Sequence, residues 1–421
     1  MLVVSEIAEN LEKFAKSMLK RNIDVSPKLK KILKLDEKRR ASQAKLDNIL
    51  AESNQLAKEI GELFKKGESE KAITLKERAA LLKEDSKKLT TNLNELVGQL
   101  KITLLDVPNV PHDLVPSGNS EKDNLKILQE GKIPELHKNA LPHWELASKY
   151  NIIDFELGTK ITGAGFPVYK DKGAKLQRAL INFFLDQNIN AGYKEIQVPI
   201  LINQDSGTAT GQLPDKEGQM YLVNEDNLYL APTAEVPVTN VFRNTIIKSS
   251  DLPICLTSYT PCFRREAGSY GAHVRGLNRL HQFDKVELVR IENPSSSYKA
   301  LEEMVNHVKS ILQELKLPFR ILKLCGGDLG FTSSLTYDFE VYSAAQKKWL
   351  EVSSVSNFET FQSNRLKLRI DDNGKKVLAH TLNGSSLALP RIVACILENF
   401  QFENYIEIPQ ILIPYTGFEK I

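Results

Sequence analysis

Apolar residues between positions 35 and 100 recur at alternating steps of four and three. Two such runs are separated by the polar segment 64–71, which contains a glycine. Because the spacing averages 3.5 residues, each run predicts a helix with one apolar seam, and a short turn lets each helix cover the other. The predicted seam positions are Leu35, Arg39, Ser42, Leu46, Ile49, Ser53, Leu56, Ile60, Leu63, Ala72, Leu75, Ala79, Leu82, Ser86, Leu89, Leu93, Leu96 and Leu100. The pattern predicts an antiparallel coiled-coil hairpin with arms of roughly 50 Å.

The pattern changes after residue 105. The segment 106–150 begins with three prolines among polar residues, which indicates a linker. Beyond it, clustered strand-like runs with few helices favour an α+β fold with an antiparallel sheet over an alternating βαβ fold. We therefore expect an N-terminal helical domain over residues 1–105, a linker over 106–150 and a second domain over 151–421.

Several elements of the second domain can be located in advance. Leu176, Leu180, Phe183 and Phe184 predict one face of an amphipathic helix. The further expected elements are a strand over 195–201, two short strands around a polar turn in 220–232, a long hairpin over 258–289, a strand over 347–358 and a helix in 386–400 with Leu387, Ala394 and Leu397 on one face.

The composition is that of an ordinary globular protein, with 42% hydrophobic and 26% charged residues in 421. No apolar run reaches the ~18 residues that a membrane-spanning helix needs. Glu6 and Glu9 lie where a signal peptide would have its apolar core. The four cysteines show no CxxC or CxxH spacing, so we expect neither a structural zinc nor a disulfide framework. A cytoplasmic enzyme or binding protein fits these features.

Positive charge is concentrated in the N-terminal segment, residues 1–100. Residues 1–100 hold 21 Lys and Arg against 16 Asp and Glu, whereas the rest of the chain is slightly acidic. The excess is compatible with a solvated helix surface, and coiled coils in general are more often structural or dimerising. The clustering near the base and the tip favours an arm that binds a phosphate backbone. The cations concerned are Lys28, Lys30, Lys31, Lys34, Lys38, Arg40, Lys45, Lys65, Lys66 and Lys71.

The hairpin over 258–289 carries the most informative chemistry. On an outgoing strand, Arg264 and Glu266 would share one face, and Phe283 and Glu287 would share a face of the return strand. An arginine fork suits phosphate, and an aromatic ring offers a stacking surface for a purine. A lone Arg-x-Glu is more often a cross-strand ion pair on a solvated face. The chain has neither a P-loop nor a GxGxxG fingerprint, so side chains would have to hold any nucleotide phosphates.

The hairpin is one of several segments that match one enzyme family. "CFRREAGSYGAHVRGLNRLHQFDKVELV" resembles motif 2 of the class II aminoacyl-tRNA synthetases, "HTLNGSSLALPRIVACILENFQ" resembles motif 3, and "GAKLQRALINFFLDQNINAGYKEIQVPIL" resembles motif 1 with its proline at Pro199. "APTAEVPVTN" and "EVSSVSNFETFQSNR" are similar to signatures of the bacterial-type seryl-tRNA synthetases. An N-terminal coiled coil is also typical of that family, so the resemblance covers the whole chain.

The resemblance implies a role for each matching residue. Arg264 would hold the ATP α-phosphate, Glu266 the adenine amine and Arg391 the γ-phosphate, while Phe283 would stack on adenine. Glu351 and Ser354 would ligate Mg²⁺, and Arg264, Arg391 and Glu351 would be the catalytic groups. The implied ATP-binding set is Arg264, Arg265, Glu266, Leu280, Phe283, Glu351, Val352, Ser353, Ser354 and Arg391. The implied serine-binding set is Thr233, Ala234, Glu235, Arg264, Glu287, Asn383 and Ser385. His281 is interpreted as structural.

The implied activity is ATP-dependent attachment of L-serine to tRNA(Ser) through a seryl-adenylate, with serine also placed on tRNA(Sec) where that tRNA exists. The implied assembly is a homodimer formed through motif 1, with a class II catalytic domain over 151–421 and a tRNA-binding arm. Another class II synthetase and a non-catalytic RNA-binding relative are the alternatives. The sequence departs from the family pattern at Arg265, Ser386 and Pro390, and the loop "GAHVRG" lacks an acidic residue that is common there.

Overall fold

The computed structural model describes residues 1–266, 271 and 274–421. The tip of the hairpin predicted over 258–289, which includes part of the loop "GAHVRG", lies mostly outside the described residues. The chain forms two compact units. One unit comprises Met1–Leu19 and Ile23–Pro108, and the other comprises Lys20–Asn22 and Asn109–Ile421.

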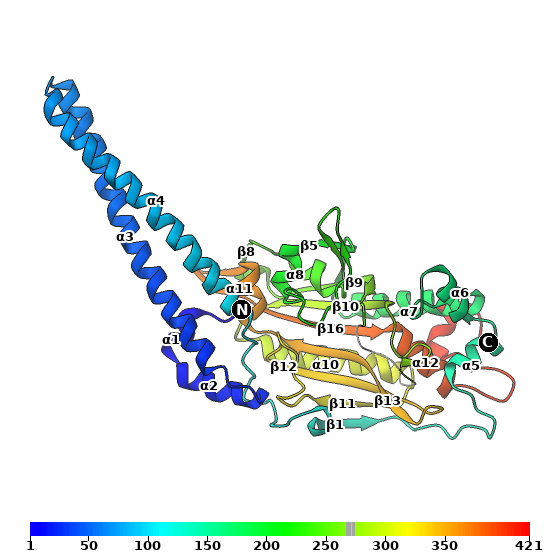
Figure 1. Ribbon diagram of the computed structural model, residues 1–421. Coiled ribbons are helices and arrows are strands. Elements are labelled where there is room, and N and C mark those ends of the chain that lie inside the picture. Colours follow the sequence, from blue (N-terminus) through cyan, green and yellow to red (C-terminus); the bar gives the residue numbers. More distant parts are fainter. Residues whose placement is uncertain (267–270, 272–273) are drawn as a thin grey trace. The chain divides into compact units, whose positions relative to one another are not determined.

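The first unit is dominated by two long helices, α3 (Ser26–Lys65) and α4 (Ser69–Leu105), which run antiparallel beside each other (Figure 1). The short helices α1 (Val4–Glu9) and α2 (Leu11–Met18) precede them. All of the predicted seam positions are buried or half-buried, and the cations named above are exposed. The predicted coiled-coil hairpin is therefore confirmed, together with its turn.

The turn and the pairing of the two helices have local causes. Gly67 has φ +77°, a left-handed conformation that glycine adopts without steric cost. Across the two helices, the Arg78 guanidinium lies 2.9 Å from Glu52 Oε1. Because both side chains are exposed, this ion pair contributes little energy, and the buried seam supplies most of the stability.

An eight-stranded sheet forms the centre of the second unit, as the antiparallel α+β prediction required (Figure 1). Neighbouring strands are antiparallel, apart from the parallel β4–β9 pair at one edge. In spatial order the strands are β1 (Leu125–Glu130), β11 (Phe319–Lys323), β12 (Leu335–Ser343), β13 (Lys348–Asn357), β16 (His380–Ala388), β10 (Gln282–Glu292), β9 (Ile254–Phe263) and β4 (Lys194–Glu195).

Three small sheets and several short helices surround the large sheet. One small sheet pairs β2 (Ile153–Asp154) with β3 (Val168–Tyr169). In the second, β7 (Leu228–Leu230) lies between β5 (Leu201–Asn203) and β6 (Leu222–Val223). In the third, β14 (Arg369–Asp372) lies between β15 (Lys375–Leu378) and β8 (Ile246–Lys248). The short helices are α5 (His143–Lys149), α6 (Phe155–Ile161), α8 (Gln204–Thr210), α9 (Glu235–Asn240), α11 (Thr360–Leu366) and α13 (Ile413–Thr416).

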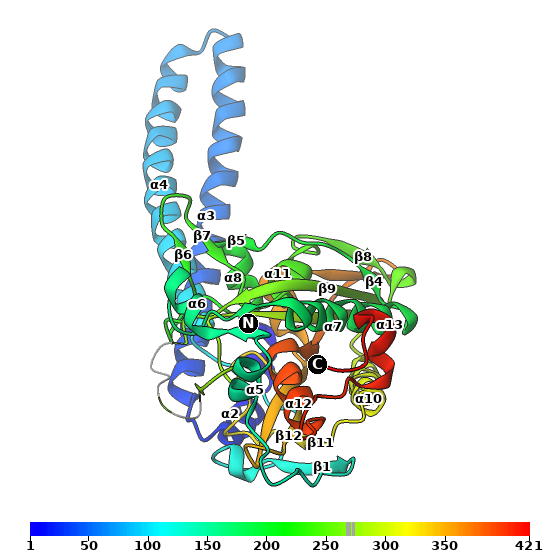
Figure 2. The same cartoon turned by 90° about the vertical axis from the view of Figure 1, so that its right-hand side faces the viewer.

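The two faces of the large sheet differ in polarity. The helices α7 (Asp171–Asn190), α10 (Ser297–Glu314) and α12 (Leu389–Asn399) lie near one another in Figure 2. Their apolar residues share one core with inward-facing strand residues such as Val286 and Leu288. Because side chains alternate along a strand, Lys285 and Glu287 of β10 point to the opposite face. That opposite face is polar around Lys285 and Glu287, where it carries the site described below, whereas Val289 and Ile291 further along β10 join a second apolar cluster.

Three sequence predictions need correction in detail. The segment 106–150, expected as a linker, contributes the edge strand β1 and helix α5. The strand expected over 195–201 is interrupted, since β4 ends at Glu195 and β5 begins at Leu201. The last predicted helix begins at Leu389, and Leu387 belongs to β16, although its side chain lies in the same core as Ala394 and Leu397.

The two departures in motif 3 are both accommodated. Pro390 lies in the first turn of α12, where its missing N–H is not needed by the helix. Ser386 is fully buried, and its hydroxyl donates to Asn188 Oδ1 of α7 at 2.8 Å. Separately, none of the helices in the described part of the chain is both long and apolar enough to cross a membrane.

Candidate active site

Two adjoining cavities open on the polar face of the large sheet. The larger cavity has a volume of about 900 Å³ and the smaller about 320 Å³. Five residues line both of them, namely Arg264, Lys285, Glu351, Ser354 and Ser385. A molecule in one cavity would therefore reach a molecule in the other across these shared side chains.

The larger cavity has an acidic and hydroxylated floor. Thr233 Oγ1 donates to Glu287 Oε2 at 3.1 Å and accepts from the Glu235 backbone N–H at 3.2 Å. Lys285 Nζ lies 2.5 Å from Glu287 Oε2. The cross-strand register of β10 and β16 places Ser385 opposite Glu287, and Asn383 lines the same cavity. The floor thus offers carboxylates and a hydroxyl to a small molecule that carries an ammonium or a hydroxyl group.

Glu235 is held in an unusual electrostatic state. Burial, followed by the negative charge of Glu287, raises the pKa of the Glu235 carboxyl to about 7. Gln362 Nε2 donates to Glu235 Oε1 at 2.6 Å, which opposes that rise without cancelling it. Perturbed carboxylates in a cavity are typical of binding and catalytic sites.

The smaller cavity combines an aromatic ring with arginines. Phe283 lines it, and the Arg264 guanidinium lies over the Phe283 ring at 5.2 Å from the centroid. Arg264 Nε donates to Pro232 O at 3.3 Å. Glu266 forms an ion pair with Arg279, which also lines this cavity. The ring, the guanidinium and the carboxylate match the needs of a purine nucleotide.

Arg391 projects from the first turn of α12 into the smaller cavity. Its Nε donates to Asn278 O at 3.1 Å, and its NH1 nitrogen donates to Glu351 O at 2.6 Å. Both hydrogen-bond acceptors are backbone carbonyls, and the Glu351 carboxylate Oε2 lies 4.0 Å from the NH1 nitrogen. The remaining N–H groups can serve an anion. Its side chain is 30% exposed, which leaves it accessible from the cavity.

Glu351 and Ser354 supply oxygen donors at the junction of the two cavities. Asp338 lies opposite Ser354 across β12 and β13, and its buried Oδ1 has no hydrogen-bond partner. Burial and the nearby charge of Glu351 raise the pKa of Asp338 well above its usual value. Within the described residues, no cluster of three or more His, Cys, Asp and Glu side chains could hold a metal ion. Oxygen donors completed by substrate phosphates and water suit Mg²⁺, so these residues fit the implied metal.

The structure brings most of the implied residues together. All of them line one or both cavities except Arg265 and Ala234. Arg265 is exposed, and its backbone N–H donates to Gln219 O at 2.9 Å, while Ala234 is fully buried. The prediction that Arg264 and Glu266 share one face of a strand is wrong, because strand β9 ends at Phe263 and both residues follow it. His281 lies outside both cavities, and its Nδ1 shares a hydrogen bond of 3.0 Å with the Tyr221 hydroxyl.

Sequence reasoning missed three residues at the site. Lys285 lies between Phe283 and Glu287 at strand spacing, so the alternation of β10 could have indicated it. Gln362 contacts Glu235 from 127 positions away, and Asp338 meets Ser354 across a strand pair. Neither of those two contacts leaves a local signal in the sequence.

The chain is similar to known proteins along its whole length. The family model "Seryl-tRNA synthetase N-terminal domain" matches residues 1–111, and "tRNA synthetase class II core domain (G, H, P, S and T)" matches residues 221–400. A serine–tRNA ligase of Salinibacter ruber is 48% identical, with 93% of this chain and 92% of the relative covered. The corresponding protein of Hydrogenobaculum sp. is 45% identical, and both chains are covered completely. The chain belongs to the seryl-tRNA synthetase family.

A solved structure supports the same assignment. The seryl-tRNA synthetase of Pyrococcus horikoshii, in a crystal structure described as complexed with ATP, superimposes with a TM-score of 0.90. It is 32% identical, and 100% of this chain and 99% of that chain are covered. Both the coiled-coil hairpin and the antiparallel sheet are therefore features of a seryl-tRNA synthetase fold.

Proposed function

We propose that this chain attaches L-serine to tRNA(Ser) in two steps, through a seryl-adenylate formed from ATP. The observation that carries the proposal is the pair of cavities with shared walls. One cavity is acidic and hydroxylated, the other is aromatic and basic, and both reach Arg264 and Glu351. The full-length similarity to proteins named serine–tRNA ligase supports the choice of serine.

The larger cavity would hold serine. Glu287, with Thr233 fixed on its Oε2, and Glu235, with Gln362 fixed on its Oε1, would contact the ammonium and the hydroxyl. Ala234 would shape the same wall, and Asn383 and Ser385 would complete the pocket. Because these groups are buried, an amino acid without a hydroxyl would leave one of them unpaired, which disfavours alanine.

The smaller cavity would hold ATP. Phe283 and Glu266 would bind the adenine, with Leu280, Val352 and Ser353 as neighbouring walls, and Arg265 would reach it only by a change of position. Arg264 would hold the α-phosphate beside the serine carboxylate, and Arg391 would hold the γ-phosphate. Glu351 and Ser354 would hold Mg²⁺, which when bound neutralises phosphate charge. Such a transfer requires position and charge stabilisation, with no covalent protein nucleophile.

The helical hairpin would bind the tRNA. The exposed lysines and arginines of α3 and α4 would contact phosphates of tRNA(Ser), and also of tRNA(Sec) where it exists, because helical RNA is recognised mainly by shape and backbone. This proposal assigns tRNA binding to residues 1–105 and catalysis to residues 151–421. It also places the enzyme in the cytoplasm, with translation.

The family resemblance further implies a homodimer formed through motif 1. The apolar face of α7 does not supply the interface, because Leu176, Leu180, Phe183 and Phe184 are fully buried within this chain. Exposed apolar residues within motif 1, such as Ile189 and Leu201, are better candidates. We expect a dimer by light scattering at micromolar concentration, and a fully active monomer would contradict this part of the proposal.

Serine-dependent ATP–pyrophosphate exchange tests the function directly. We expect exchange with serine, and much weaker exchange with alanine, threonine and proline. Exchange with another amino acid would indicate a different class II synthetase. Loss of exchange with every amino acid, together with tRNA binding, would indicate a non-catalytic RNA-binding relative.

A further inference from the structure

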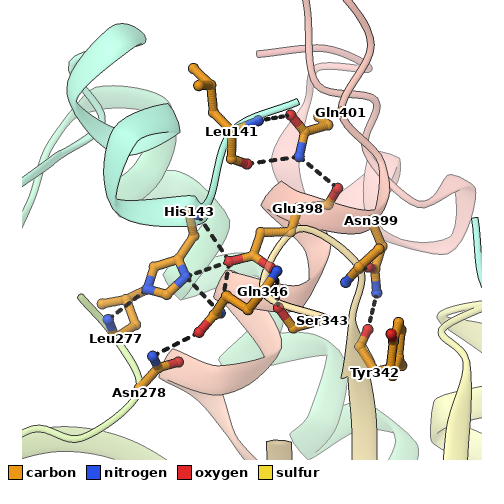
Figure 3. A network of polar contacts seen from close by, with 11 residues as sticks. Leu141, His143, Leu277, Asn278, Tyr342, Ser343, Gln346, Glu398, Asn399 and Gln401 are labelled. Atoms are coloured by element: carbon orange, nitrogen blue, oxygen red, sulfur yellow. Dashed lines mark hydrogen bonds and ion pairs between the residues drawn. The ribbon is translucent and has the colours of Figure 1, made fainter. Parts of the chain in front are cut away.

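A buried polar network joins α5 and α12 to Leu277 and Asn278, two residues that line the smaller cavity (Figure 3). Its centre is the pair of His143, in α5, and Glu398, in α12, whose side chains are both 0% exposed. His143 Nδ1 lies 2.7 Å from Glu398 Oε1. The two residues are 255 positions apart, and neither belongs to the implied ATP or serine sets.

Glu398 is satisfied as an ionised carboxylate. Its Oε1 accepts from the His143 backbone N–H at 3.0 Å and from Gln346 Nε2 at 2.8 Å, and its Oε2 accepts from the Ser343 hydroxyl. Burial alone would raise the pKa of Glu398, and the hydrogen bonds from His143 and Ser343 oppose that effect. The carboxylate therefore fixes the orientation of the His143 ring.

The other ring nitrogen of His143 points at the return segment of the β9–β10 loop. The Leu277 backbone N–H donates to His143 Nε2 at 2.8 Å. Because Nε2 accepts, the ring proton must be on Nδ1, where it is donated to Glu398. The fit leaves no spare space, since a Cβ at Gly276 would lie 2.2 Å from His143 Nε2. His143 thus fixes the backbone of Gly276 and Leu277.

The next residue connects this segment to the proposed phosphate site. Asn278 O accepts from Arg391 Nε at 3.1 Å. The Asn278 side-chain amide donates to Gln346 Oε1 at 2.9 Å, and the Gln346 amide in turn donates to Glu398. The network therefore holds Asn278 twice, once through the backbone of Leu277 and once through Gln346.

We propose that His143 and Glu398 are positioning residues for the nucleotide site, which fix the Asn278 carbonyl and through it the guanidinium of Arg391. The inference rests on the proposed function, because it assigns Arg391 to the ATP phosphates. It predicts that loss of the hydrogen bond from the Leu277 backbone to His143 weakens ATP binding, while the serine pocket, built from β10, β16 and α9, is unaffected.

Two amide substitutions at His143 separate positioning from simple packing. In H143N, the side-chain amide takes the place of Nδ1 and keeps the contact with Glu398, but nothing accepts from Leu277. In H143Q, the longer side chain places its carbonyl oxygen where Nε2 accepts from Leu277. We expect H143N to raise the KM for ATP in serine-dependent exchange about tenfold, the scale of one unsatisfied buried donor. We expect H143Q to stay within about threefold of the unchanged protein, and the KM for serine to stay constant in both.

The matched control is another buried histidine of the same unit. His380 lies at the end of β16 that is remote from Arg391, and its Nδ1 shares a hydrogen bond of 2.7 Å with the Ser297 hydroxyl. H380Q breaks a comparable buried contact, so a comparable loss of thermal stability is expected, without a change in the KM for ATP. An equal increase in H380Q, or identical effects of H143N and H143Q, would overturn the proposal and leave only a packing role.

A less buried position keeps the proposal testable if both His143 variants fail to fold. Gln346 is only half-buried, and Q346A removes the second support of Asn278 while the His143–Glu398 pair stays intact. We expect the KM for ATP to rise about threefold with an unchanged KM for serine. A folded Q346A protein with an unchanged KM for ATP would contradict the proposal. If the unchanged protein itself showed no serine-dependent exchange, the proposed function would fail instead.

Discussion

The helical hairpin and the polar face of the sheet are both rich in charged residues, but they are built from contacts of different range. In the hairpin, ion pairs such as Lys88–Glu84 and Arg40–Asp36 join residues four positions apart, and one apolar seam supplies the core. On the sheet, the Thr233–Glu287 bond spans 54 positions and the Arg391–Asn278 bond spans 113. The hairpin can therefore tolerate many single changes, whereas each residue of the site depends on distant ones.

The largest effect on activity is expected from substitution of Arg391 in the site. R391A removes a fixed cation from the nucleotide site, so we expect serine-dependent exchange to fall at least ~100-fold, the scale of one preorganised charge contact. The control is R369A, which removes an exposed arginine from the small β14 sheet and should leave exchange unchanged. Near-normal exchange in R391A would remove Arg391 from the proposed mechanism.

A smaller effect is expected from the titration of Glu235. The folded pKa of about 7 lies above the ordinary value of 4.5, so the folded state holds this proton more tightly than the unfolded chain. The resulting stability is present at low pH and is lost as the pH rises towards 7 and through it. Between pH 5 and pH 7, the ionisation of Glu235 should lower the unfolding free energy of the unchanged protein by about 2 kcal/mol. E235Q should not show this decrease.

Chemical denaturation at the two pH values measures this difference. The exposed Glu302 of α10 provides a matched control, since E302Q removes a carboxylate that is not buried. E302Q should follow the pH dependence of the unchanged protein. Parallel curves for the unchanged protein and E235Q would mean that Glu235 ionises normally in the folded state.

The tRNA side of the comparison is tested by removing the hairpin. Deletion of residues 30–100, with a short linker in their place, should leave serine-dependent exchange nearly intact. The KM for tRNA should rise about tenfold or more, and its dependence on salt should flatten, because phosphate contacts make affinity fall with salt. Charging of tRNA at the unchanged rate would show that the hairpin is structural, and loss of exchange would show that it belongs to the catalytic fold.

The elements that sequence predicts correctly are those built from local contacts, as in the helical hairpin. The seam from Leu35 to Leu100 was read correctly because a 3.5-residue period is a local property of the chain. The long hairpin of β9 and β10 was also read from its own pattern. Strand β1 was missed because it is an edge strand with mostly exposed side chains, so its segment resembles a linker.

At the site, resemblance to a family located residues that no local pattern could bring together. Thr233 and Glu287 lie on different elements, and their contact depends on the packing of α9 against β10. The network around His143 was invisible from sequence for the same reason, since a lone histidine beside a proline carries no signal. Only Lys285 could have been found from strand alternation alone.

The smallest expected effect concerns the polar residues of the seam. Ser86 is a half-buried seam position, and its hydroxyl bonds only the Lys83 carbonyl one turn earlier. S86L adds apolar surface to the seam and replaces serine with a better helix former, so we expect a gain of about 1 kcal/mol in local stability. K87L is the matched control, because Lys87 is the neighbouring residue and is exposed. In the full-length protein, the backbone amides of α4 should exchange hydrogen more slowly in S86L than in K87L. Serine-dependent ATP–pyrophosphate exchange should be unchanged in both variants. Equal protection in the two variants would mean that helix propensity, and not the buried seam, limits the stability of the hairpin.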